Sequence, residues 1–186
     1  PDLITKYQPD LVIANGENAA HGSSLTAKTA RELNQAGVDY LTNGDHAFLR
    51  NGKTEVFDLP YVIRPANFPP GVAGLGHQLV EVGAEGKEKL LLVNLLGRVF
   101  MGKHYDCPFR KTEEILANYD LPTLDGFAII VDIHSEATAE KQALKHFLDG
   151  RVSTLLGTHT HVMTADPEIT AQGTGYITDV GMVGAA

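Results

Sequence analysis

The sequence predicts an α/β fold, and the first part of the chain shows why. Residues 10–14 and 38–42 are short apolar runs typical of buried parallel strands. Between them, residues 26–36 carry alanine and leucine at helical spacing, with Thr26 as the expected cap and Gly37 as the stop. A strand, a helix and a strand in close succession form a βαβ unit, so the two strands should be parallel neighbours.

The remaining elements follow from the same kinds of pattern. Their expected ranges are an antiparallel hairpin of residues 77–82 and 89–95 with its turn at 85–87, helices over 110–119 and 136–148, and strands over 127–131, 152–156 and 175–178. A proline-rich loop over 64–71 and a loop over 97–107 lie between some of them. We expect one domain over residues 1–186, because this length holds one sizeable core but is short for two.

The composition is that of an ordinary globular protein, with 43% hydrophobic and 20% charged residues. No stretch reaches the roughly 18 consecutive apolar residues of a membrane span, and the first residues lack the plan of a signal peptide. The single cysteine, Cys107, permits no internal disulfide and fits a reducing compartment. The net charge of −8 argues against an extended basic nucleic-acid surface. An anionic substrate would therefore need a local positive charge, for which metal ions are candidates.

Metal-ligand residues follow four of the expected strands. The loop after residues 152–156 contains His159 and His161, and two histidines just past a strand end can turn toward one point. Neutral imidazole nitrogens are preferred ligands of borderline transition metals, although a polar loop that merely holds two histidines is the alternative. The other three strand ends carry Glu17-Asn18, Asp45-His46 and His134.

These residues should meet, because ligands of α/β sheets bind outside the carboxyl ends of the strands. Two carboxylates and four imidazoles exceed what one tetrahedral ion uses and suit two ions roughly 3.5–4 Å apart. Each residue also has an ordinary explanation: Glu17 as a surface acid, Asp45 as a turn former and His134 as a strand-end histidine. Their coincidence at four strand ends favours the metal site.

The same residues resemble the signature blocks of the calcineurin-like metallophosphoesterases. The matching blocks are Gly16-Glu17-Asn18, Gly44-Asp45-His46, His134 and Gly157-Thr158-His159-Thr160-His161. Longer strings are similar to the YmdB-like branch of that family: Asn15 to Gly22, Arg64 to Asn67, His134 to Lys141 and Thr178 to Met182. The resemblance covers nearly the whole chain.

The resemblance implies a β-sandwich flanked by helices and a dinuclear site for iron or manganese, with zinc as a further candidate. It also implies a bacterial, cytoplasmic phosphodiesterase that acts on small diesters such as 2′,3′-cyclic nucleotides or on RNA ends. The implied partner is thus a small nucleotide, and no membrane partner is implied. The resemblance leaves open whether the protein forms a homo-oligomer. A regulatory metal-binding protein with weak turnover is the rival reading. A structural zinc site is disfavoured, because such sites prefer cysteines at short spacings.

The family's roles carry over position by position. Glu17 would bridge both ions, and His161 would complete the first ion with Asn18 nearby. The second ion would be held by Asp45, His134 and His159. His46 would be the general acid, and a metal-bound hydroxide the nucleophile.

Two departures from the family pattern accompany the resemblance. The family's first block supplies an aspartate that should precede residue 1, and Asp45 stands where the family has asparagine. The chain also opens within what resembles the end of a helix and stops after a glycine-rich loop, so we expect a domain truncated at both ends.

Other polar residues fit either a structural or a functional role. His21 and Arg64 are candidates for substrate contacts. Each could instead brace its own loop, and for Arg64 this structural role is the favoured one. No convergence with the site is expected for His77, His104 and His146, and Cys107 is read as a packing or surface thiol.

Overall fold

A computed structural model describes residues 2–48, 54–83, 88–119 and 127–184. The strands are β1 (Ile13–Asn15), β2 (Tyr40–Thr42), β3 (His77–Val82), β4 (Glu88–Leu96), β5 (Phe127–His134), β6 (Thr154–Thr158), β7 (Glu168–Ile169) and β8 (Gly175–Ile177). The helices are α1 (Asp2–Tyr7), α2 (Ala27–Gln35), α3 (Pro108–Ala117) and α4 (Thr138–Leu148), with a short 3-10 helix at Glu55–Asp58. None of the described helices is long and apolar enough to cross a membrane.

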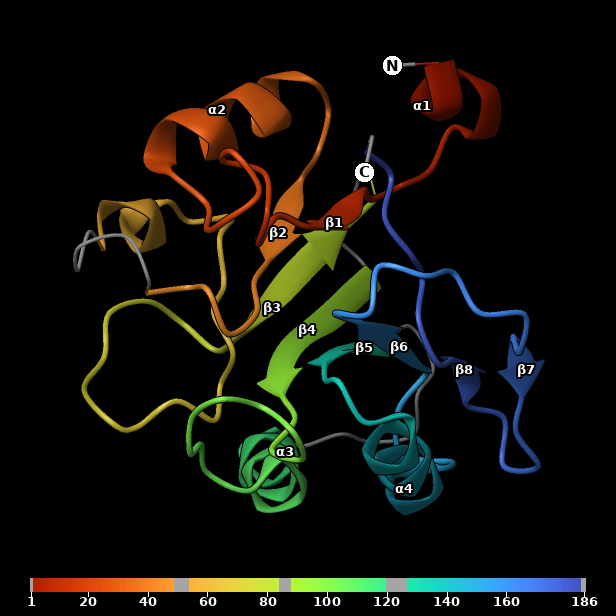
Figure 1. Ribbon diagram of the computed structural model, residues 1–186. Helices are drawn as coiled ribbons and strands as arrows, with labels where there is room; N and C mark the ends of the chain where they lie inside the picture. Colours follow the sequence, from red (N-terminus) through yellow and green to blue (C-terminus); the bar gives the residue numbers. More distant parts are fainter. Residues whose placement is uncertain (1, 49–53, 84–87, 120–126, 185–186) are drawn as a thin grey trace.

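The centre of the molecule is a six-stranded sheet of order β3-β4-β5-β6-β8-β7. Strands β4, β5, β6 and β8 run parallel, while β3 and β7 pair antiparallel at the two edges. A separate parallel pair, β1-β2, lies against one face of this sheet (Figure 1). Helices α3 and α4 cover the opposite face (Figure 1).

Both faces of the central strands are covered, which explains why these strands read as nearly continuous apolar runs. On β4, Leu91, Val93 and Leu95 pack toward α3 and α4 in the larger core. The alternate residues Leu90 and Leu92 belong to a second cluster that includes residues of β1 and β2. The layers are therefore helices, central sheet and small sheet, in agreement with the α/β fold predicted from the sequence.

The predicted βαβ unit is present as β1, α2 and β2. Strands β1 and β2 are parallel, and the Thr26 side chain caps α2 by accepting from the Thr29 amide. The first strand begins at Ile13 rather than at residue 10. Before that point, the Val12 amide bonds the Asp39 side chain instead of a neighbouring strand.

Most other boundaries lie within a few residues of the predicted ones. Helix α3 begins at Pro108 rather than at residue 110, as expected for proline, which suits the first helical position. Helix α4 begins at Thr138, two residues after its predicted start. The predicted turn at residues 85–87 lies outside the described residues. The two-residue strand β7 was not predicted, because so short a segment has no usable periodicity.

The parallel register brings several strand ends to one edge. Leu96 of β4 lies beside His134 of β5, and His134 lies beside Thr158 of β6. The small sheet joins the same edge through Asp132, whose carboxylate accepts from Asn15 Nδ2 at 3.1 Å and from Thr42 Oγ1 at 2.5 Å. This buried polar contact holds the two sheets together where their strands end.

Candidate metal centre

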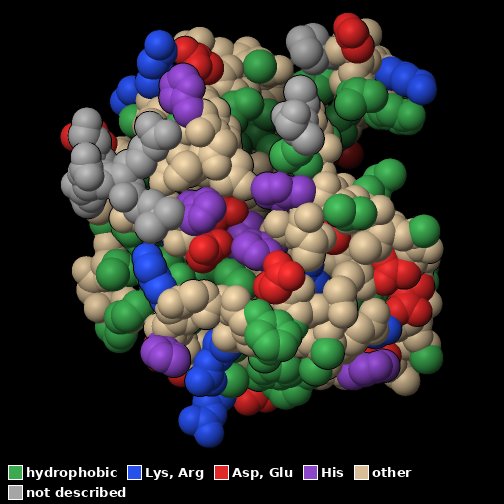
Figure 2. Space-filling model, in the orientation of Figure 1, with side chains coloured by type: hydrophobic (Ala, Val, Ile, Leu, Met, Phe, Trp, Pro, Cys, Tyr) green, Lys and Arg blue, Asp and Glu red, His purple; other side chains and the backbone are tan. Residues whose placement is uncertain are grey.

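Four side chains from four strand ends meet at this edge. They are Glu17, Asp45, His134 and His159, and one ligand atom from each lies within 4.8 Å of the others. Figure 2 shows acidic and histidine side chains gathered near the centre of the face in view. The convergence expected from the sequence is therefore present for these four residues.

Glu17 lies at the base of the cluster with 2% of its surface exposed. Its Oε1 accepts from the His46 amide at 2.7 Å, and its Oε2 lies 2.8 Å from His134 Nε2. Gly44 makes this approach possible, because a Cβ at that position would lie 2.3 Å from His134 Nε2 and 2.4 Å from Glu17 Oε1. Any side chain at Gly44 would displace the two candidate ligands.

A hydrogen-bond relay determines which nitrogen of His134 faces the cluster. Thr158 Oγ1 donates to Asp132 Oδ1 at 2.7 Å, so it accepts from His134 Nδ1 at 3.0 Å. The proton on Nδ1 is therefore used in the hydrogen bond to Thr158, and Nε2 of the neutral ring carries the lone pair. That nitrogen faces Glu17 and Asp45, as a metal ligand would.

Asp45 supplies the observation that tests whether a cation fits. Its Oδ1 is buried and has no hydrogen-bond partner among the described residues, although it lies 3.3 Å from His134 Nε2 and 3.7 Å from His159 Nδ1. A buried carboxylate oxygen without a donor calls for an ion or a water. With two carboxylates and two imidazoles around one point, the donor set suits a borderline divalent metal.

The titration behaviour of the cluster reflects the same geometry. Burial lowers the pKa of His134, but the carboxylates of Asp45 and Glu17 outweigh it and raise the pKa to about 9. The neighbouring His134 in turn lowers the pKa of Asp45 to about 2. Without a metal, a proton on His134 Nε2 thus supplies the positive charge that the carboxylates require.

His159 closes the cluster from the other side. Its Nδ1 lies 2.9 Å from His134 Nε2, and its Nε2 lies 3.1 Å from Glu136 Oε2. Burial and then the charge of His134 lower the pKa of His159, which favours the neutral, ligating form. His159 has φ 103° and His161 has φ 63°, a strained backbone that is often kept where function requires it.

A second group adjoins these four residues. Asn18 Nδ2 donates to His161 Nε2 at 3.0 Å, and Asn18 Oδ1 accepts from His46 Nδ1 at 3.2 Å. His46 Nε2 lies 3.8 Å from Asp45 Oδ2, so the His46 ring connects the two groups. The structure therefore places Asn18, His46 and His161 beside the metal cluster rather than within it.

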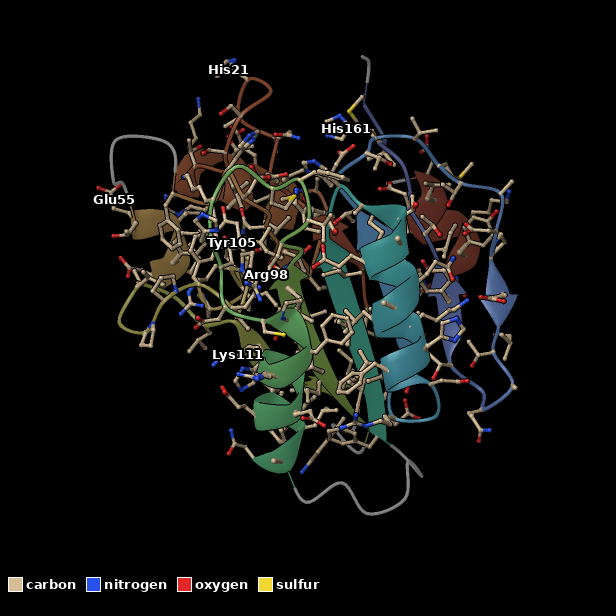
Figure 3. All side chains as sticks on the ribbon, turned by 60° about the horizontal axis from the view of Figure 1, so that its bottom comes forward. His21, Glu55, Arg98, Tyr105, Lys111 and His161 are labelled. Carbon is tan, nitrogen blue, oxygen red and sulfur yellow. The ribbon has the colours of Figure 1, made fainter. Side chains whose placement is uncertain are left out.

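The two candidate substrate contacts are placed differently. His21 is exposed on the loop after β1 (Figure 3). Arg64 donates to the carbonyls of Pro65 at 2.8 Å, Ala73 at 3.2 Å and Val72 at 3.5 Å. This pattern is the bracing role that the sequence analysis favoured for Arg64.

Tyr105 is a site residue that the sequence analysis missed. Its side chain is 6% exposed, and its hydroxyl has no hydrogen-bond partner among the described residues. Burial raises its pKa to about 12, with a smaller contribution from the charges of Asp45 and Glu17, so the phenol is a neutral donor. An unpartnered donor beside a carboxylate cluster is the signal, and only the folded chain reveals it.

The backbone that carries His159 and His161 is held by a buried ion pair. Lys141 Nζ donates to Thr158 O at 2.8 Å and to Asp179 Oδ2 at 3.0 Å, and both side chains are almost fully buried. Asp179 Oδ2 also accepts from the Thr160 amide at 3.0 Å and from the Thr160 hydroxyl at 2.8 Å. Residues on both sides of His159 are thus tied to one charge pair.

The chain was also compared with known proteins. Residues 1–186 match the family described as YmdB-like protein. The chain is 48% identical over 188 residues to a Bacillus subtilis (strain 168) protein named 2′,3′-cyclic-nucleotide 2′-phosphodiesterase, covering 99% of this chain and 67% of that protein. It is 40% identical over 188 residues to a putative phosphatase/phosphodiesterase of Mycoplasma pneumoniae, covering 98% and 64%. These names are those of hydrolases.

Solved structures give the same picture. A hypothetical protein from Thermus thermophilus superposes with a TM-score of 0.88 at 45% identity, covering 100% of this chain and 69% of that one. A structure described as a novel phosphatase from Mycoplasma pneumoniae superposes with a TM-score of 0.86 at 39% identity, covering 97% and 64%. The predicted metallophosphoesterase-type α/β fold is confirmed.

The chain spans about two thirds of the length of the curated relatives that it matches. The family match extends over residues 1–186 and so includes the strings around the four strand ends. The chain belongs to the YmdB-like protein family.

Proposed function

We propose that this chain carries the active site of a metal-dependent phosphodiesterase that hydrolyses small diesters such as 2′,3′-cyclic nucleotides. The observation that carries the proposal is the cluster of Glu17, Asp45, His134 and His159, in which a buried carboxylate oxygen and an imidazole lone pair face one point. The name of the Bacillus subtilis relative supports the choice of substrate.

We further propose a dinuclear site, with iron or manganese as the candidate ions. Asp45, His134 and His159 would hold one ion, His161 and Asn18 would contribute to the other, and Glu17 would lie between them. When bound, such ions neutralise phosphate charge and lower the pKa of a coordinated water so that it can attack phosphorus near neutral pH.

The chain's own residues would then position the ester and supply protons. Asn18 Oδ1 accepts from His46 Nδ1, so the other ring nitrogen, which lies 3.8 Å from Asp45 Oδ2, would be the one to donate to a leaving oxygen. The Tyr105 hydroxyl would donate to a phosphate oxygen, because it is buried without a partner among the described residues and the charges of Asp45 and Glu17 act on it. Without cations, the carboxylates of Glu17 and Asp45 would repel the anionic phosphodiester. Substrate binding should therefore depend on metal loading.

Metal removal tests the proposal directly. Stripping the protein with a chelator is expected to abolish hydrolysis of 2′,3′-cyclic AMP, and manganese or iron(II) should restore it. Metal content measured alongside should rise with activity. Turnover by metal-free protein would contradict the metal-dependent mechanism. Full metal content without turnover would instead favour a regulatory metal-binding protein.

Replacing Tyr105 by phenylalanine should lower activity while stabilising the fold. Loss of one donor to a charged phosphate is expected to cost about 10- to 100-fold in kcat/KM. Removal of an unpaired buried hydroxyl should raise the free energy of unfolding by about 1 kcal/mol. Tyr7→Phe, on an exposed residue of α1, is the matched control and should change neither quantity. Equal activity of Tyr105→Phe and wild type would remove Tyr105 from the mechanism.

A further inference from the structure

His159 has two ring nitrogens, and one of them contacts a residue that has no role in the proposed chemistry. Its Nδ1 lies 2.9 Å from His134 Nε2 and 3.7 Å from Asp45 Oδ1, so this nitrogen faces the other candidate ligands. Its Nε2 lies 3.1 Å from Glu136 Oε2. Glu136 belongs neither to the metal cluster nor to the residues proposed to handle the substrate. Its contact with His159 therefore needs an explanation of its own.

The distance between the two histidine rings determines where His159 carries its proton. His134 Nε2 and His159 Nδ1 are 2.9 Å apart, so at most one proton fits between them. A metal ion bound by both rings needs a lone pair on each of these nitrogens. A neutral His159 that presents the Nδ1 lone pair carries its proton on Nε2, and that is the nitrogen beside Glu136.

The two histidines are arranged alike with respect to carboxylates. His134 Nδ1 donates to Thr158 Oγ1, which donates to Asp132 Oδ1, so a carboxylate lies behind this ring through one hydroxyl. Behind the ring of His159, the carboxylate of Glu136 is in direct contact. Metal-binding histidines commonly donate their second N–H to a carboxylate, which fixes the ring and raises the basicity of the ligating nitrogen. Glu136 has the position of that carboxylate for His159.

The backbone on both sides of Glu136 is held by hydrogen bonds. The Ser135 amide donates to the Thr158 carbonyl at 3.4 Å, just beyond the end of β5. The Ala137 carbonyl accepts from the Lys141 amide at 3.3 Å in the first turn of α4. Glu136 is therefore fixed between a strand end and a helix start, so its side chain can reach His159 without ordering a loop.

The contact with His159 can be removed without disturbing the core. The Glu136 side chain is 50% exposed, and His159 is its one ion-pair partner within residues 2–48, 54–83, 88–119 and 127–184. Pairs as exposed as this one contribute little to the stability of the fold. A change in metal binding after substitution of Glu136 would thus report on His159 rather than on unfolding.

We propose that Glu136 is a positioning residue of the metal centre, whose carboxylate accepts the Nε2 proton of His159 and so keeps the Nδ1 lone pair directed at the metal. Glu136 itself touches neither the metal nor the substrate. The inference rests on the proposed function and deepens it, because it adds a residue that controls metal affinity through a ligand.

Manganese binding to the metal-free protein, measured by calorimetric titration, tests the proposal without turnover. Glu136→Ala should weaken the binding of about one ion per chain by about 10- to 100-fold. Glu136→Gln removes the charge but keeps an acceptor oxygen, so it should recover most of that affinity. Glu113→Ala is the control, because Glu113 is a 56% exposed carboxylate that lies 3.6 Å from Arg151 Nη1. This control removes an equal charge and should bind manganese as the wild type does.

Histidine ¹⁵N–¹H NMR of the metal-free protein at slightly alkaline pH gives a second readout, because it reports which ring nitrogen carries the proton. Wild-type His159 should carry it on Nε2, and His159→Gln identifies these signals by their loss. The Nε2 proton should exchange with water faster in Glu136→Ala than in the wild type. In Glu136→Gln the exchange should stay close to the wild-type rate.

Three results would overturn the positioning role: a wild-type proton on Nδ1 of His159, wild-type manganese affinity in Glu136→Ala, or equal weakening in Glu136→Ala and Glu136→Gln. The last result would mean that only the negative charge matters. Hydrolysis of 2′,3′-cyclic AMP separates this inference from the proposed function. If the wild type binds manganese without turnover, the proposed function fails, yet weakened binding in Glu136→Ala would still support the role of Glu136. Normal wild-type turnover with unchanged affinity in Glu136→Ala would refute the positioning role alone.

Discussion

Replacing His134 with glutamine is expected to remove about one metal ion per chain and to lower diester hydrolysis by at least roughly a thousandfold. The expectation follows from the His134 lone pair, which the hydrogen bond from Nδ1 to Thr158 directs at Glu17 and Asp45. Changing a residue behind a ligand typically costs about 10- to 100-fold in metal affinity or activity, so losing the ligand itself should cost more. Metal analysis and steady-state kinetics on 2′,3′-cyclic AMP measure the two effects.

The control for this variant is His146→Gln, because His146 is exposed on α4 and is not one of the four residues of the cluster. It should retain the metal content, activity and unfolding temperature of the wild type. Thermal unfolding of His134→Gln shows whether the fold survives the substitution. Full metal content together with normal turnover in a folded His134→Gln protein would disprove the ligand assignment.

Replacing Lys141 with methionine is expected to lower the free energy of unfolding by about 3–5 kcal/mol, because it leaves Asp179 charged, buried and unpaired. The Thr158 carbonyl loses its donor at the same time. Because this pair holds the backbone around His159, metal affinity should fall as well, even though Lys141 touches no candidate ligand side chain. Urea unfolding and a metal-binding titration measure the two changes.

The pH dependence of this stabilisation follows from Asp179. Burial raises its pKa, but hydrogen bonds from Gly181, Lys141 and Thr160 outweigh that effect and hold the pKa below the ordinary value of 3.8. The contribution is therefore fully present above that value and is lost as the pH falls through the lower, folded pKa.

Lys28→Met is the matched control for Lys141. Lys28 pairs with Glu32 at 3.8 Å, but the two side chains are 85% and 59% exposed. An exposed pair of this kind contributes only about 0.3–0.5 kcal/mol. Similar losses in the two variants would show that the buried pair has no special role.

Much of the metal centre could be predicted from the sequence because the ligands directly follow strands. Glu17 comes after β1, Asp45 after β2, His134 ends β5 and His159 follows β6. In parallel strands those ends lie at one edge, so adjacency in the fold follows from position in the chain. The family resemblance pointed to the same residues, and the comparisons confirmed the family.

The contacts behind the ligands could not be predicted. The relay from Asp132 through Thr158 to His134 requires the register of β5 against β6, and strand pattern does not specify that register. An aspartate two residues before His134 on the same strand face was the available signal. The sequence held no such signal for Tyr105. Its position depends on a loop that is held by Asn67, whose side-chain amide donates to the carbonyls of Leu96 and Asp106.

Local pattern in the chain was enough to predict the βαβ start, the strong central strands and the strand ends that carry ligands, since these depend on periodicity and on the geometry common to parallel sheets. The folded arrangement was needed to learn which carboxylate oxygen lacks a partner among the described residues and which imidazole nitrogen faces the cluster. These properties arise from contacts between segments far apart in the chain. Hydrogen bonding and charge depend on distances that no local pattern encodes.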